Sequence, residues 1–73
     1  MRPNKEQEEK INCITADIEE LMNFYDVDDR SYFLSMMSSI LCELDTDITI
    51  GVMERLGPEG KDEALAIKVN YGY

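Results

Sequence analysis

Residues 31–42 have the sequence SYFLSMMSSILC and contain no charged side chain, although charged residues make up 32% of the 73-residue chain. A stretch of this length and composition predicts a helix that is buried on more than one side. Its apolar face is broader than one short hairpin can cover, so we expect it to form the interface of a homodimer. The residues of this predicted interface are Tyr32, Phe33, Met36, Met37, Ile40, Leu41 and Leu44.

The same helix carries a second stripe, made of small residues that let a neighbouring helix approach closely: Ser31, Ser35, Ser38 and Cys42. One neighbour can be the preceding helix, folded back about Val27 as an antiparallel hairpin, and another can be a third helix or a second subunit. Met36 and Met37 fit two interpretations. They are either adaptable core filling or part of a Met-rich docking groove.

The segment before this stretch predicts a helix that begins at Asn4, because Asn is a strong N-cap and Gln7 can complete a capping box. Apolar residues then recur at spacings of 3, 4, 3 and 4, as in an a/d seam of about two heptads. They are Ile11, Ile14, Ile18, Leu21 and Tyr25. We expect this seam to be buried within the same small bundle.

Three aspartates, Asp26, Asp28 and Asp29, lie between the two predicted helices and invite comparison with a calcium-binding loop. Such a loop needs acidic ligands at alternate positions and a glutamate at its twelfth position. Counted from Asp26, the fifth position is Arg30 and the twelfth is Met37. We therefore predict that Asp28 or Asp29 caps the second helix, and we expect neither a metal site nor a cofactor.

A third helix is predicted from about Asp47 to Leu56, capped by Asp45 or Asp47, and the following GPEGK sequence predicts a turn. In the tail, Leu65, Ile67, Val69 and Tyr71 alternate with other residues as they would in a strand, whereas DEALAIK fits a short helix equally well. A single strand has no partner in a helical monomer. We therefore favour the helix, with an intersubunit strand pair as the exception.

These elements predict an all-α fold, a helical hairpin or three-helix bundle, in a single domain of residues 1–73 with loose ends at 1–4 and 70–73. A core this small supplies about 3 to 5 kcal/mol, which makes self-association a natural reinforcement.

The chain has no histidine, and its two cysteines, Cys13 and Cys42, form no CxxC pair and have no basic neighbour that would lower a thiol pKa. General-base and thiolate catalysis both lack their usual groups. We therefore expect no catalytic residues and no enzyme activity. Both cysteines are predicted to be buried thiols.

Sixteen acidic residues against seven basic ones give a net charge of -9. This charge disfavours direct contact with nucleic acid or with an anionic membrane surface. No apolar run approaches the roughly 20 residues of a membrane helix, and the N-terminal MRPNKEQEEK lacks the apolar region of a signal peptide. We expect a cytoplasmic protein.

The acidic residues are concentrated in residues 17–29, which contain no basic residue: Asp17, Glu19, Glu20, Asp26, Asp28 and Asp29. Further acids at 43, 45 and 47 extend the group. Such a group is either an ordinary solvated face or an anionic surface that binds a basic partner protein. In the second case it would mimic nucleic-acid phosphates and inhibit a nucleic-acid-binding partner. Small acidic helical proteins of this kind are common among accessory proteins of phages and mobile elements. The alternative is a structural or assembly protein whose helical homodimer is the functional unit.

Overall fold

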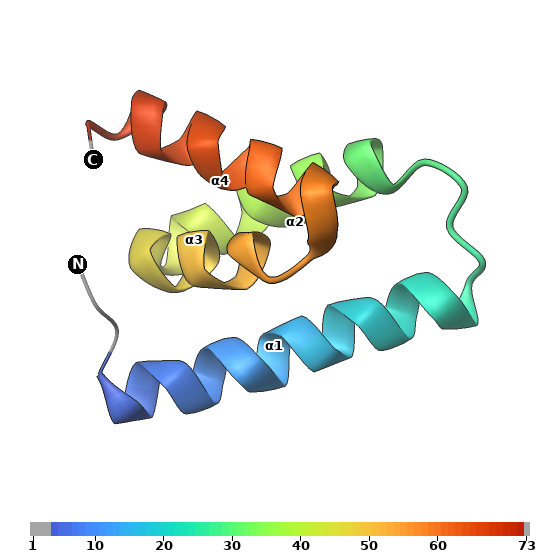
Figure 1. The fold of residues 1–73 in the computed structure, drawn as a ribbon, viewed down its shortest axis with the longest axis horizontal. Helices are drawn as coiled ribbons and strands as arrows, with labels where there is room; N and C mark the ends of the chain where they lie inside the picture. Colours follow the sequence, from blue (N-terminus) through green and yellow to red (C-terminus); the bar gives the residue numbers. More distant parts are fainter. Residues whose placement is uncertain (1–3, 73) are drawn as a thin grey trace.

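The computed structural model describes residues 4–72, and within that range the chain is all-helical, with no strand (Figure 1). Its four helices are α1 (Lys5–Phe24), α2 (Arg30–Leu44), α3 (Thr46–Glu54) and α4 (Gly57–Asn70). The all-α prediction is confirmed, but the predicted three-helix bundle has one helix fewer than the structure. The tail forms α4, so the favoured interpretation as a helix is confirmed and the strand alternative is wrong. No helix among residues 4–72 is long and apolar enough to cross a membrane.

The predicted capping box at the start of α1 is present. The Asn4 side chain accepts a hydrogen bond from the backbone N–H of Gln7 at 2.8 Å, and the Gln7 side chain accepts one from the backbone N–H of Asn4 at 3.0 Å. Asn4 is therefore a structured cap and not a loose end. At the other terminus α4 continues through Asn70. Of the other predicted loose residues, Tyr71 and Gly72 form a turn after α4, and residues 1–3 and 73 lie outside the described range.

The buried line of α1 departs from the predicted seam in its second half. Its buried residues are Ile11, Thr15, Ile18 and Met22. Leu21 and Tyr25 are instead 43% and 69% exposed. A straight helix repeats every 3.6 residues and drifts away from a strict heptad repeat. The buried face therefore rotates away from the seam toward the C-terminal end of α1.

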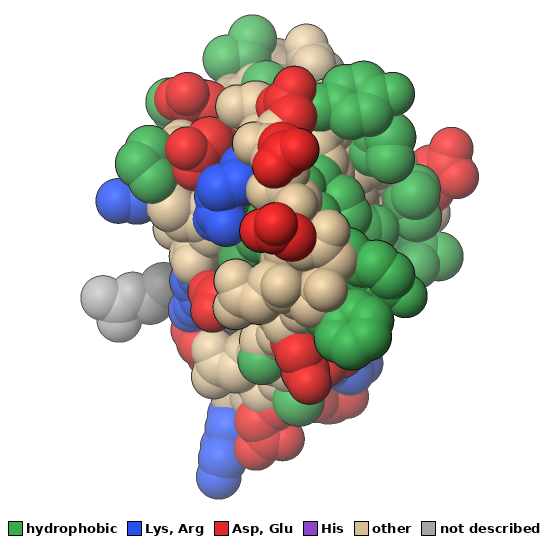
Figure 2. All heavy atoms as spheres, turned by 90° about the vertical axis from the view of Figure 1, so that its right-hand side faces the viewer, with side chains coloured by type: hydrophobic (Ala, Val, Ile, Leu, Met, Phe, Trp, Pro, Cys, Tyr) green, Lys and Arg blue, Asp and Glu red, His purple; other side chains and the backbone are tan. Residues whose placement is uncertain are grey.

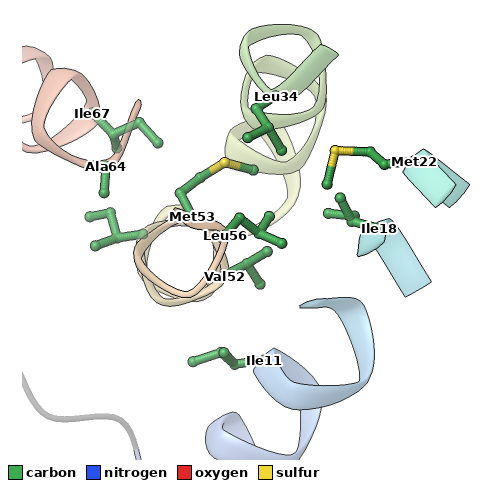
Figure 3. Packing of buried hydrophobic residues seen from close by; sticks show 10 residues of the cluster. Ile11, Ile18, Met22, Leu34, Val52, Met53, Leu56, Ala64 and Ile67 are labelled. Carbon is green, nitrogen blue, oxygen red and sulfur yellow. The ribbon is translucent and has the colours of Figure 1, made fainter. Parts of the chain in front are cut away.

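The short helix α3 forms the centre of the molecule. Every residue from Thr49 to Met53 is buried, as expected for a helix that is enclosed on all sides. Figure 3 shows Val52 and Met53 surrounded by side chains from the other three helices. α1 packs mainly on α3, whereas α2 packs on both α3 and α4. The predicted hairpin of the first two helices is therefore wrong, because α3 takes the place expected for α2.

The GPEGK sequence begins α4, and the prediction of a simple turn there is wrong. Gly57 has a φ of 79°, a left-handed conformation that glycine adopts without steric cost. It allows the chain to reverse directly after Leu56. Pro58 then lies in the first turn of α4, where its fixed φ suits a helix and its missing N–H costs little.

Candidate interaction surfaces

The predicted interface on α2 is divided by the structure into two parts. Phe33, Met37 and Leu41 are half-buried and pack against the core. The remaining four residues form an exposed line at four-residue intervals, which we call the α2 ridge: Tyr32 (65% exposed), Met36 (45%), Ile40 (55%) and Leu44 (80%). Leu34, which was not part of the predicted face, is fully buried on the opposite side of the helix.

Two further aromatic residues are exposed at the end of α1. Phe24 is 78% exposed and Tyr25 is 69% exposed, and their rings stack edge to face with centroids 4.9 Å apart. Figure 2 shows hydrophobic side chains gathered along the right-hand side of that view. We call Phe24 and Tyr25 the aromatic pair. Phe24 was not predicted from the sequence, because it lies off the predicted seam of α1.

One residue of the stripe of small residues on α2, Ser38, contacts α4. Ser38 is buried, and its hydroxyl donates to the Ser35 carbonyl oxygen at 2.9 Å and to the Glu63 carboxylate of α4 at 3.1 Å. Only part of the stripe contacts other helices: Cys42 is half-buried and forms a hydrogen bond with Thr49 of α3, whereas Ser31 and Ser35 are exposed. The prediction of a close helix neighbour therefore holds for Ser38 and Cys42 and is wrong for Ser31 and Ser35.

All six acidic residues of the predicted partner-binding surface are exposed, but they do not share one face. Asp17 and Glu20 are three positions apart on α1 and share one side of it, while Glu19 is rotated by about 100° from Glu20. The other three lie in the connection to α2. Asp29 has a local role there: its carboxylate accepts the Tyr32 N–H at 3.0 Å and caps α2, as predicted.

The ion pairs of the protein leave these acids unneutralised. Among residues 4–72 the salt bridges are Glu6–Lys10 at 3.5 Å, Glu59–Arg30 at 3.4 Å, Glu8–Arg55 at 3.0 Å and Glu54–Lys68 at 3.0 Å. None of them involves an acid between positions 17 and 29. Asp45, which was counted as an extension of the acidic group, caps α3 by accepting the Ile48 N–H at 3.1 Å.

A cavity of about 290 Å³ lies between α1, α3 and α4. Its lining includes the Arg55–Glu8 and Lys68–Glu54 pairs over a floor that contains Ile11. Arg55 also donates to the Gly51 carbonyl oxygen at 2.8 Å. The cations that could hold an anionic ligand here are already engaged, so we assign this cavity no ligand.

The two cysteines have different surroundings, and both are free thiols. Cys13 is exposed, so the prediction of a buried thiol is wrong for it. Cys42 is half-buried, and burial raises the pKa of its thiol, while a hydrogen bond with Thr49 acts in the opposite direction. Within the described range no three histidine, cysteine or acidic side chains are placed to hold a metal ion.

Comparisons with protein-family models, with curated proteins and with solved structures find no match to this chain.

Proposed function

We propose that the protein is a small interaction module whose working unit is a homodimer formed through the α2 ridge and the aromatic pair. The observation that supports this most directly is the ridge itself: four large apolar side chains on one line, each between 45% and 80% exposed. Contiguous apolar surface of this kind marks interaction sites on soluble proteins.

The size of this surface fits a dimer interface. An aromatic side chain buries about 150 to 250 Å² and an aliphatic one somewhat less. Scaled by their exposures, the ridge and the aromatic pair leave roughly 700 Å² of apolar area on each protomer, close to the ~800 Å² per partner of a standard interface.

Sedimentation velocity on the parent chain and two aspartate variants tests this proposal. Ile40→Asp places a charge in the middle of the ridge, and Leu65→Asp is the matched control on α4, where Leu65 is 60% exposed. At tens of micromolar we expect a dimer for the parent and for Leu65→Asp, and a monomer for Ile40→Asp. Circular dichroism checks that both variants are folded. A parent that is a folded monomer at this concentration would exclude the homodimer.

A second candidate function is favoured by the distribution of ion pairs. The exposed acids of positions 17–29 take part in no salt bridge within the described range, whereas Arg30, Arg55 and Lys68 each pair with a glutamate elsewhere. This leaves an anionic surface on α1 and the connection after it. In this function the surface binds a basic, nucleic-acid-binding partner and inhibits it by occupying the site of the phosphates.

Charge reversal separates this function from the first. Asp17→Lys with Glu20→Lys reverses two acids on one side of α1, and Asp62→Lys is a control at an exposed acid of α4. In a pull-down from the native host, we expect the parent and the control to retain basic proteins at low salt and release them at high salt, because surface charges are screened. Equal retention by the double variant would place the binding surface elsewhere. The dimer, which is held by apolar contacts, should persist at both salt concentrations.

A further inference from the structure

The two ends of the apolar surface of α2 differ in the size of their side chains. The C-terminal end of α1, which carries the aromatic pair, and the N-terminal end of α2, which begins two residues before Tyr32, both lie toward the right-hand end of the molecule in Figure 1. At the C-terminal end the ridge finishes with Leu44, its most exposed member. From Tyr32 to Leu44 the ridge extends for about 18 Å along the helix axis.

We propose that two copies of the chain pair with their α2 helices antiparallel, about a two-fold axis that passes between Met36 and Ile40. This inference rests on the homodimer proposed above and adds its geometry. In a two-fold interface every contact occurs twice. Tyr32 of each copy then packs on Leu44 of the other, and Met36 of each copy packs on Ile40 of the other.

Shape favours this orientation over a parallel one. A parallel pair would place both sets of aromatic rings at one end, where they hold the helices apart, and would leave Leu44 facing Leu44 across a gap at the other end. The antiparallel pair places a large side chain against a smaller one at both ends, which keeps the packing close along the whole ridge. Antiparallel helix dipoles also attract each other weakly.

Charge does not select between the two orientations. Asp28 and Asp29 lie just before α2, and Glu43 and Asp45 lie at its other end. Acidic groups of the two copies approach each other in either arrangement, so repulsion opposes both to a similar extent. The choice therefore depends on the shape of the ridge.

Cross-linking between single cysteines tests the orientation. In a Cys13→Ser, Cys42→Ala background, one chain carries Tyr32→Cys and a second, longer tagged chain carries Leu44→Cys. A bismaleimide of suitable length spans two packed helices, which lie about 8 to 10 Å apart. It cannot bridge the roughly 18 Å that separate residue 32 of one copy from residue 32 of the other, or residue 44 from residue 44, in an antiparallel pair. We expect mixed cross-links in the mixture and none within either chain alone. Cross-links within each chain alone would establish a parallel dimer and overturn the inference while leaving the homodimer intact.

A charge-swap variant provides a test that needs no cysteine substitution. The Met36→Lys, Ile40→Glu double variant places each introduced ammonium opposite an introduced carboxylate of the other copy only in the antiparallel pair. We expect the double variant to dimerise several-fold more tightly than either single variant in sedimentation. A double variant that dimerises no more tightly than either single variant would overturn the antiparallel arrangement. A parent protein that is monomeric would overturn the homodimer itself, and the inference with it.

Discussion

Gly60 of α4 lies in close contact with α3, and we predict that Gly60→Ala destabilises the fold. A Cβ atom at this position would collide with the Met53 carbonyl oxygen and would lie 2.8 Å from the Leu56 Cβ. The first of these is backbone in the central helix and cannot rotate away. Insertion of a methyl group into a packed site costs about 1 to 3 kcal/mol, and a fixed backbone neighbour favours the upper part of that range.

An opposing contribution comes from helix propensity. Alanine is favoured over glycine inside a helix by about 1 kcal/mol, so the expected net loss is about 2 kcal/mol. A domain of this size has a free energy of unfolding of roughly 4 to 11 kcal/mol. The substitution should therefore remove a large fraction of the stability.

Gly51→Ala is the matched control for Gly60→Ala. Gly51 is also buried within a helix, but the added Cβ would meet the end of the Ile11 side chain, 2.5 Å from its Cδ1 and 3.2 Å from its Cγ1. A side-chain end can shift, and the same gain in helix propensity applies. We expect a change of less than about 1 kcal/mol in either direction. Gly60→Ala should therefore be the more destabilising variant by at least about 1 kcal/mol.

The measurement is urea unfolding followed by circular dichroism at one fixed protein concentration, since dimerisation makes stability depend on concentration. A lower midpoint with an unchanged slope for Gly60→Ala is the expected result. If Gly60→Ala is as stable as the parent, α3 and α4 are not in the close contact described above. Equal losses for the two variants would show that crowding by backbone and by side chain cannot be distinguished in this core.

Three further predictions concern single side chains. Thr15→Val should raise the free energy of unfolding by about 1 kcal/mol in urea titration. The reason is that the Thr15 hydroxyl is buried without a hydrogen-bond partner in the described structure. A loss of stability would show that this hydroxyl does have a hydrogen-bond partner. Asp29→Ala should lower the free energy of unfolding by about 1 kcal/mol through loss of the cap on α2, and Asp29→Asn should largely retain it. Burial raises the pKa of the Cys42 thiol. The stability that the neutral thiol contributes is therefore complete below the ordinary thiol pKa and is lost as the pH rises through the raised pKa of the folded protein. Cys42→Ala should therefore flatten the alkaline decrease in stability measured by urea unfolding between neutral pH and pH ~10, and an unchanged decrease would show that Cys42 does not cause it.

The features that were predicted correctly from the sequence are local. Asn4 with Gln7, Asp29 and Asp45 act on N–H groups three residues away. A cap of this kind is determined by neighbouring residues along the chain, so its spacing in the sequence is sufficient evidence. The all-α class follows for the same reason, because helix-forming hydrogen bonds and side-chain spacing are both local.

The tail shows where local evidence ends. Residues 65–71 alternate like a strand and also fit a helix, so their own pattern does not decide between the two. The structure forms α4 there, and Gly60 lets that helix pack closely against α3. A strand would have needed hydrogen bonds from a partner strand, and the helix satisfies its own. The packing of α4 against α3 thus favours the helix, a choice that the local sequence pattern alone does not make.

The candidate interaction surface was also only partly determined by the sequence. The uncharged stretch of α2 showed that this helix has more apolar surface than one neighbour can cover. Only the packing of α3 and α4 decided that Leu34 is buried and that Met36 and Ile40 remain exposed. Likewise the sequence supplied the acidic charge, but the ion pairs across helices, such as Arg55 with Glu8, decided which acids are neutralised. Burial and charge pairing depend on residues that are distant in sequence, and these come together only in the folded chain.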